Sequence, residues 1–452
     1  MNTVQNEVEK FPRQIRFIIG NEACERFSYY GMRCILVVFM INHLKMAQED
    51  AKAVYHLFAS AVYLLPLLGA YLADRFFGKY KTILVLSLVY CLGHLVLSVW
   101  EGQNGLYFGL GLIALGAGGI KPCVSAYVGD QFTEKNKTLI QKVFDLFYFS
   151  INFGSFFSTL LIPILLIKYG PQVAFGIPGV LMAIATLIFW MGRKSYVNVS
   201  PVKQSESAGF LAVLMDCPSL DATRSKYSAE EVEGAKAVLS IIKVFATVSI
   251  FWALFDQNAS SWVIQAQQMD LNIWGMHVEA AQIQALNPIM VMILIPVFGS
   301  GIYLFFQKLG VQVTPLRKMS VGMILAGVSF VVVGFLQSLL DSGHVVSVGW
   351  QILPYLIITC AEVIISITEL EFAYTQAPRA MKSTIMSFWL LTVFVGNLLD
   401  AWIAKLNVFQ GAMSFYFFAG LMFLVSILFV MSAARYKVRN YVEKAAPKLA
   451  MA

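Results

Sequence analysis

Charged residues are scarce in this chain of 452 residues. Asp, Glu, Lys and Arg together make up 13% of it, whereas hydrophobic residues make up 58%. A soluble globular domain carries about 25% charged residues, so the composition excludes an ordinary soluble domain. The sequence therefore indicates a protein that lies in a membrane.

Motifs of catalysis and metal binding are also missing. The six cysteines lie mostly in apolar runs without a CxxC or Cys/His spacing, and the five histidines are scattered. Neither HExxH nor GxSxG occurs. These absences argue against a membrane enzyme, a disulfide framework and a metal site. We expect a protein that is not an enzyme and that needs no cofactor.

A cleavable leader is missing as well. The polar segment up to about Arg16 mixes acids and bases, and it contains no short apolar core followed by a cleavage site. We therefore expect the first apolar segment to remain as a membrane span.

Long apolar segments, in contrast, recur along the whole chain. About 20 helical residues, at 1.5 Å each, cross the ~30 Å core of a bilayer. The pattern predicts an all-α membrane protein with twelve spans, at about 15–44, 51–78, 80–101, 104–128, 141–166, 172–192, 236–267, 283–307, 315–339, 348–374, 383–407 and 412–434.

The basic residues, which give the chain its formal charge of +7, are distributed as the predicted topology requires. With the N-terminus in the cytoplasm, most of the 33 Lys and Arg residues fall in cytoplasmic loops and the two tails. The opposite loops hold Lys45, Lys52, Lys168 and Lys405. The positive-inside rule thus predicts cytoplasmic N- and C-termini, and the basic balance calls for no nucleic acid as a partner.

One long polar segment interrupts the spans between the sixth and the seventh. It contains Pro201 and Pro218, and its apolar run 210–215 is too short to cross a bilayer. We therefore predict a six-helix bundle at 1–193, a cytoplasmic linker at 194–235 and a second six-helix bundle at 236–452.

The first predicted span carries a polar stripe. Glu22, Arg26, Tyr29 or Tyr30, and Arg33 follow one another at steps of three and four residues, with Glu25 beside them, so they share one helix face. Each ionisable group at mid-bilayer costs about 2.5–3.5 kcal/mol, so the stripe must face protein or water. Two interpretations remain: an ion-pair cluster that joins helices, or a site for a charged ligand, which we favour.

Two six-span halves with a cytoplasmic linker resemble the major facilitator superfamily, in which a central cavity lies between two bundles. The run 69–82 matches that superfamily's GxLxDRxGxK signature after the second span. Glycines permit a tight turn there, and Asp74 can bond the start of a neighbouring helix. We expect Asp74 and Arg75 to form a structural gate and not a substrate site.

Five runs together are similar to the proton-dependent oligopeptide transporter family, also called POT or PTR. They lie at 22–31, 116–123, 144–155, 251–262 and 355–378, and the resemblance covers all twelve spans. It implies a symporter that imports di- and tripeptides, and peptide-like drugs, by alternating access. The proton would be the coupling ion, the protein a monomer, and its location the plasma membrane, here the bacterial inner membrane.

The resemblance also assigns site residues, position by position. Positions that hold the peptide carboxylate match Arg26, Tyr30, Arg33 and Lys121. Positions that hold the peptide amino terminus match Asn152, Asn287 and Glu362. Proton-coupling positions match Glu22, Glu25 and Arg26, and pocket aromatics match Tyr63, Trp252 and Trp389.

The chemistry of these residues agrees with such a substrate. A dipeptide is a zwitterion, so its receptor needs a cationic and an anionic pole a fixed distance apart. The bases of the first half supply one pole, and Glu362 supplies the other. The alternative is a transporter of the same fold for another small organic or anionic solute such as nitrate, which would need only the cationic pole.

Two features depart from the family pattern. Many bacterial members insert two extra spans between the halves, whereas the linker here is too short and polar for that. His56 matches a histidine of animal members that many bacterial ones lack. With an unperturbed pKa of ~6.5, His56 could relay protons; a neutral histidine bonded to a neighbouring helix is an equally good interpretation.

Overall fold

The computed structural model describes residues 11–132, 136, 139–199, 227, 229–273, 275–376 and 382–436. Most of the predicted linker lies outside these residues. The chain divides into two compact units, which are described one at a time below. The first unit comprises 1–46 and 64–203, and the second comprises 47–63 and 204–452.

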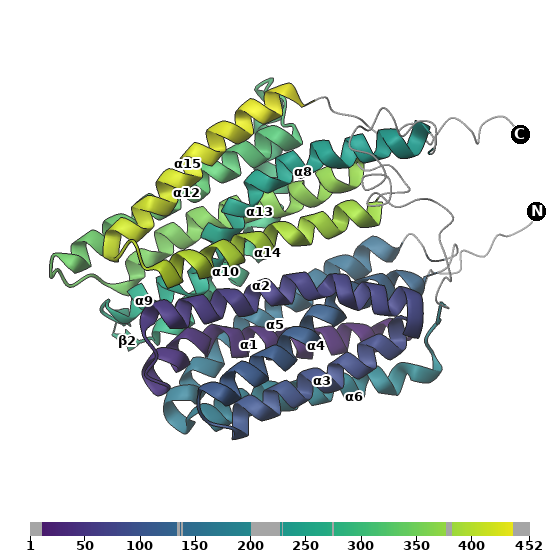
Figure 1. The fold of residues 1–452 in the computed structure, drawn as a ribbon, viewed down its shortest axis with the longest axis horizontal. Helices are drawn as coiled ribbons and strands as arrows, with labels where there is room; N and C mark the ends of the chain where they lie inside the picture. Colours follow the sequence, from purple (N-terminus) through teal and green to yellow (C-terminus); the bar gives the residue numbers. More distant parts are fainter. Residues whose placement is uncertain are drawn as a thin grey trace, which may run out of the picture. The chain divides into compact units, whose positions relative to one another are not determined.

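In the described residues of the first unit, the regular elements are helices (Figure 1). They are α1 (Ile15–Val38, continued by a π turn Phe39–His43), the later part of α2 (Gln48–Leu72, continued by a π turn Ala73–Phe77), α3 (Lys79–Val99), α4 (Gln103–Asp130), α5 (Ile140–Tyr169) and α6 (Pro171–Met191). Helix α1 packs against α5 and α6, and α3 packs against α4 and α6.

Glycines bring two of these helices into backbone contact. A Cβ atom on Gly69 of α2 would overlap the backbone of Gly119 on α4. Close approach of this kind is how helices associate inside lipid, where no hydrophobic force drives them together. The glycine-rich run 116–119 therefore positions Lys121, two residues further along α4.

The second unit contains the early part of α2 and all later helices. These are α8 (Ala229–Asp256), α9 (Ser261–Gln267), α10 (Leu286–Val297), α11 (Tyr303–Lys308), α12 (Pro315–Asp341), α13 (Ile352–Gln376), α14 (Lys382–Leu406) and α15 (Gly411–Arg435). Two short strands, β1 (Asn272–Ile273) and β2 (Met276–His277), pair antiparallel between α9 and α10.

Helix α2 is shared between the units, and two contacts attach its early part to α14. The Ser60 hydroxyl donates to the carbonyl of Phe394, at 3.1 Å. Lys405 pairs with Asp50, at 2.5 Å. The predicted domain boundaries at 193 and 235 stay predictions.

Eleven helical segments of the described residues are long and apolar enough to cross a membrane. They match the second to twelfth predicted spans. The first predicted span is present as α1 with its π turn, but its five charged residues set it apart: Arg16, Glu22, Glu25, Arg26 and Arg33. In the described residues, twelve helical elements, eleven of them long and apolar enough to cross a membrane, therefore make up the helical architecture.

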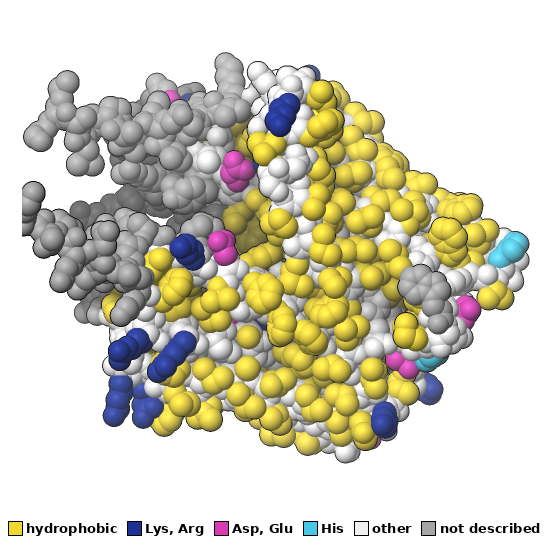
Figure 2. Space-filling view, turned by 180° about the vertical axis from the view of Figure 1, so that it is seen from behind, with side chains coloured by type: hydrophobic (Ala, Val, Ile, Leu, Met, Phe, Trp, Pro, Cys, Tyr) yellow, Lys and Arg dark blue, Asp and Glu magenta, His cyan; other side chains and the backbone are white. Residues whose placement is uncertain are grey.

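Large hydrophobic side chains face outward from these helices. On α3, for example, Val85, Leu88, Leu92, Leu95 and Val99 are all about half exposed or more. Figure 2 shows hydrophobic side chains over most of the visible face, with few charged ones among them. Such a surface suits lipid and would aggregate in water.

Candidate functional site

The polar stripe of α1 forms a buried ion-pair cluster. Arg26 Nε lies 2.6 Å from Glu22 Oε1 and 2.9 Å from Glu25 Oε2. Glu22 and Glu25 are about 2% and 1% exposed and Arg26 about 8%. Glu22 and Arg26 meet because residues four apart stack on one helix face. One guanidinium thus balances two carboxylates, so the cluster has a net negative charge when both acids are ionised.

Lys121 reaches the same face of α1 from α4. Its Nζ atom lies 4.7 Å from the centroid of the Tyr29 ring, a cation–π contact. Tyr29 in turn packs edge-on against Tyr30, with ring centroids 5.3 Å apart. The structure therefore brings Lys121, which the family resemblance assigns to the substrate site, close to the tyrosines of the predicted stripe.

Three further predicted residues lie on helices of the first unit. Tyr30 and Arg33 are half-buried on α1. Asn152 on α5 is buried, and its Nδ2 donates to the Tyr148 carbonyl at 3.0 Å. Its amide N–H is thus engaged by its own helix.

In the second unit, two predicted residues meet directly. Asn287, in the first turn of α10, donates from Nδ2 to Glu362 Oε2 at 2.6 Å and to Thr359 Oγ1 at 3.2 Å. Glu362 and Thr359 lie on α13, one turn apart. The short bond orients the half-buried Glu362 carboxylate, which prepares it to accept from a further donor such as an ammonium group.

Helix α13 carries a second acid, Glu369, that sequence reasoning missed. Its side chain is fully buried. It accepts from Trp252 Nε1 at 3.2 Å and from Thr392 Oγ1 at 3.3 Å. A signal was available, because Glu369 follows Glu362 by seven residues, two helical turns, and so shares its face.

The predicted aromatic residues have different surroundings. Trp252 is buried on α8, where its indole N–H contacts Glu369 and its ring packs edge-on against Phe251 and Phe255. Trp389 on α14 and Tyr63 on α2 are half-buried. The structure therefore gives Trp252 a bonding role inside the second unit that the prediction of a pocket aromatic did not include.

His56 lies at the centre of a polar cluster in the second unit. Its Nδ1 is 3.0 Å from Asn397 Oδ1 and its Nε2 is 2.8 Å from Ser260 Oγ. Asp400 Oδ2 lies 3.6 Å from Nδ1. His56 and Asp400 are both nearly inaccessible to solvent. These partners come from α14 and from the segment after α8, so the histidine joins three elements.

The predicted gate residues end α2. Asp74 and Arg75 are exposed in the π turn Ala73–Phe77. Gly78 follows with a φ of 75°, which glycine adopts without strain. Next to it, Lys79 pairs with Asp130 at the end of α4, at 2.6 Å. Among the described residues, no group of three or more His, Cys, Asp or Glu side chains could hold a metal ion.

Comparison with known proteins gives consistent matches. Residues 80–216 and 211–415 match the family PTR2, described as the POT family. The human protein "Solute carrier family 15 member 2" is 40% identical over 352 residues, which cover 71% of this chain and 48% of the relative. The chain therefore spans about half the length of the curated relatives that it matches.

Solved structures match over nearly the whole chain. An auto-inhibited POT family peptide transporter has a TM-score of 0.90 at 41% identity, covering 95% of this chain and 98% of the other. A mutant of peptide transporter POT in complex with alafosfalin has a TM-score of 0.79 at 26% identity, covering 94% and 95%. The helical fold is therefore that of a multi-pass membrane protein of the major facilitator superfamily.

Proposed function

This chain belongs to the POT family, which is a family of transporters and not of enzymes, and from this premise we propose that it is a proton-coupled symporter that imports di- and tripeptides by alternating access. The matching structure of a POT family peptide transporter supports this proposal. So does the charge distribution of the two units. The first contains a cluster with two bases next to tyrosines, and the second contains a carboxylate oriented by an amide.

The observation that carries the proposal is the contact between Asn287 and Glu362, at 2.6 Å. A transporter for anions alone would have no need of an oriented acid that stays accessible to a ligand, whereas a peptide ammonium group needs such a partner. Arg26, Tyr30, Arg33 and Lys121 would hold the peptide carboxylate. Glu362, with Asn287 and Asn152, would hold the amino terminus, and Tyr63, Trp252 and Trp389 would contribute apolar surface.

Proton coupling would reside in the α1 cluster. Arg26 balances Glu22 and Glu25 at the same time. If the peptide carboxylate draws Arg26 away, the two acids lose their counter-charge and take up a proton more readily. Peptide and proton would then load together, and both would leave into the neutral cytoplasm.

We further propose the arrangement in which this cycle would run. Two six-helix bundles, 1–193 and 236–452, would be joined by the cytoplasmic linker 194–235, with both termini in the cytoplasm. The monomer would lie in the plasma membrane, the inner membrane of a bacterium. Asp74 and Arg75 would act in the cytoplasmic gate, and His56 would relay protons. Peptide-like drugs would share the substrate site.

Reconstituted liposomes test the function. Purified protein should accumulate labelled dialanine against its concentration gradient when the outside is acidic, and a proton ionophore should abolish accumulation. Uptake of nitrate or another small solute without uptake of dialanine would favour the alternative function.

A further inference from the structure

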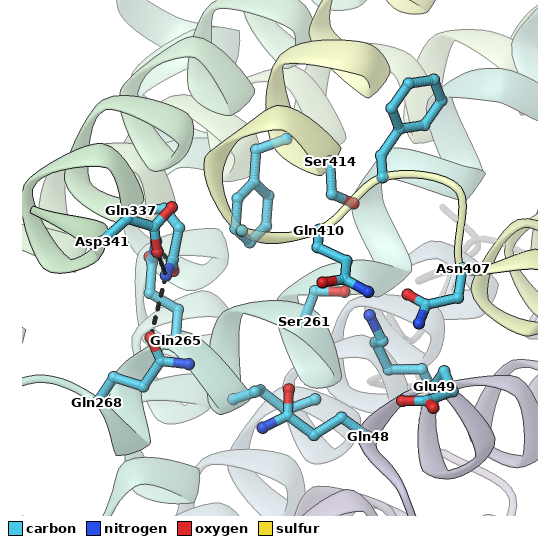
Figure 3. Close-up of a pocket in the computed structure, with 15 residues that line it drawn as sticks. Gln48, Glu49, Ser261, Gln265, Gln268, Gln337, Asp341, Asn407, Gln410 and Ser414 are labelled. Atoms are coloured by element: carbon cyan, nitrogen blue, oxygen red, sulfur yellow. Dashed lines mark hydrogen bonds between the residues drawn. The ribbon is translucent and has the colours of Figure 1, made fainter.

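Two cavities of the second unit differ sharply in chemical character. The first, of about 440 Å³, is lined by amide, hydroxyl and charged side chains, which come from α2, α9, α12 and the start of α15 (Figure 3). Walls with so many donors and acceptors hold water, whereas an apolar cavity stays dry. The second cavity, of about 710 Å³, has hydrophobic walls over nearly its whole surface. Its occupant must therefore be apolar.

The apolar cavity is a groove between helices. Helices α10 and α12 each pack against α13, and side chains from all three parts of the unit line the groove. They include Phe298 and Phe306 from the segment of α10 and α11, Leu325 on α12, and Ile357 and Cys360 on α13. The groove thus separates the segment of α10 and α11 from α12.

The segment beside the groove is loosely covered by the rest of the unit. Only 11% of the apolar window of Ala280–Lys308, which contains α10 and α11, is buried, against 33–61% in the other ten spans. The core that it shares with α13 contains four buried side chains, Val291, Phe298, Val363 and Ile364. Apolar surface is therefore left over on this segment for a further partner.

Basic side chains lie at one end of the groove. Its two charged lining residues, Arg317 and Lys318, are in the first turn of α12. Lys318 pairs with Glu371 at 3.2 Å. Among the described residues, the side chain of Arg317 makes one hydrogen bond, from Nη1 to the Gln312 carbonyl at 2.9 Å. A guanidinium group carries five N–H donors, so the exposed Arg317 retains donors for an anion.

The length of the groove matches one leaflet of a bilayer. Arg317 and Leu325 are eight residues apart on α12, which is about 12 Å at 1.5 Å per residue. Half of the bilayer core of ~30 Å is about 15 Å. With the predicted topology, α12 begins at the cytoplasmic face, where basic residues attract the anionic lipids of that leaflet.

We propose that this groove binds one anionic phospholipid of the cytoplasmic leaflet. An acyl chain lies between α12 and the segment of α10 and α11, and the phosphate group accepts from Arg317, whose planar fork suits phosphate oxygens. The bound lipid covers apolar surface that the protein leaves open and holds α11 beside α12. The inference does not depend on which solute the protein transports.

The first test uses phosphatidylglycerol with a photoreactive diazirine in one acyl chain. The purified protein is placed in vesicles of phosphatidylcholine that contain a small fraction of this probe, and mass spectrometry locates the crosslinks. They should concentrate on peptides around Leu325 and Cys360. The exposed apolar face of α3, with Leu88 and Leu92, should be labelled much less.

Arg317→Gln should lower labelling of the groove about tenfold, the factor that one charge-assisted contact supplies. The matched control is Arg193→Gln, which removes an exposed arginine from the end of α6 in the first unit; it should leave labelling unchanged. Equal labelling of the groove and α3, equal labelling by a phosphatidylcholine probe, or full labelling of Arg317→Gln would overturn the inference. Crosslinks from the groove to a second copy of the chain would also overturn it.

The second test needs no variant. Phosphatidylglycerol added to the parent protein in detergent should raise its melting temperature, because a ligand that binds only the folded state stabilises it. Phosphatidylcholine at the same concentration should raise it less. Equal melting temperatures with the two lipids would contradict the choice of an anionic lipid.

Discussion

Glu362 and Glu369 are two turns apart on α13, but their partners differ. Glu362 is half-buried and oriented by Asn287, whereas Glu369 is fully buried between Trp252 and Thr392. The first arrangement leaves the carboxylate accessible to a ligand, and the second uses the carboxyl group to join α8, α13 and α14. We therefore expect separate effects from substituting the two acids.

Glu362→Gln should weaken dipeptide binding strongly. It removes the charge that would pair with the peptide ammonium group, and loss of one partner of a buried pair costs about 3–5 kcal/mol. Binding is measured by calorimetry on the purified protein. The control is Glu371→Gln on the same helix, where the acid is half exposed and pairs with Lys318 at 3.2 Å; an exposed pair contributes at most about 1 kcal/mol. Equal affinities of parent and Glu362→Gln would rule out this ligand contact.

Glu369→Leu should instead lower stability. It leaves the indole N–H of Trp252 without its acceptor in a buried site, at a cost of about 1–3 kcal/mol, whereas the Thr392 hydroxyl keeps the Trp389 carbonyl as an acceptor, at 2.7 Å. The melting temperature in detergent, followed by tryptophan fluorescence, should fall, and Glu369→Gln should recover part of the loss because its amide oxygen still accepts. An unchanged melting temperature in the leucine variant would show that these bonds contribute little.

At the scale of the helix, the sequence predicted where the helices lie along the chain better than it predicted which side chains contact one another. The apolar runs located the spans because about 20 apolar residues suffice to define a crossing. The breaks inside the predicted seventh and eighth spans, at Gln257–Ala259 and Phe298–Ile302, were not predicted. The first contains neither Gly nor Pro, whereas the second contains Gly299 and Gly301 and follows Pro296, so a signal was available there. The partners of His56 could not be predicted either, because Asn397 lies 341 residues away along the chain.

Contact between α2 and α4 gives a test at the same scale. Gly69→Ala would place a methyl group in the backbone of Gly119, and such overpacking costs about 1–3 kcal/mol. The melting temperature should fall, and the pairing of these helices should loosen. Gly111→Ala on α4 is the control, since a Cβ atom there meets nothing within 4 Å. If both variants had the melting temperature of the parent, the glycine contact would be unimportant for stability.

For the whole molecule, the α1 cluster predicts that peptide uptake driven by a pH gradient can be lost while peptide exchange across the membrane is kept. Glu22→Gln and Glu25→Gln each mimic a protonated acid and keep the bases of the cluster in place. Neither variant can release a proton at the substituted position, so the pH gradient can no longer drive the cycle through it. Both should lose uptake driven by an acid exterior and retain exchange of labelled for unlabelled peptide across a liposome membrane.

The control for that experiment is Glu101→Gln, which removes an exposed acid between α3 and α4 in the same unit. It should keep both gradient-driven uptake and exchange. If Glu22→Gln and Glu25→Gln still concentrated peptide under an acid-outside gradient, the coupling proton would have to bind elsewhere. His56 and Glu362 would be the next residues to test. A variant that lost exchange as well would point to a structural role for the ion pairs of Arg26.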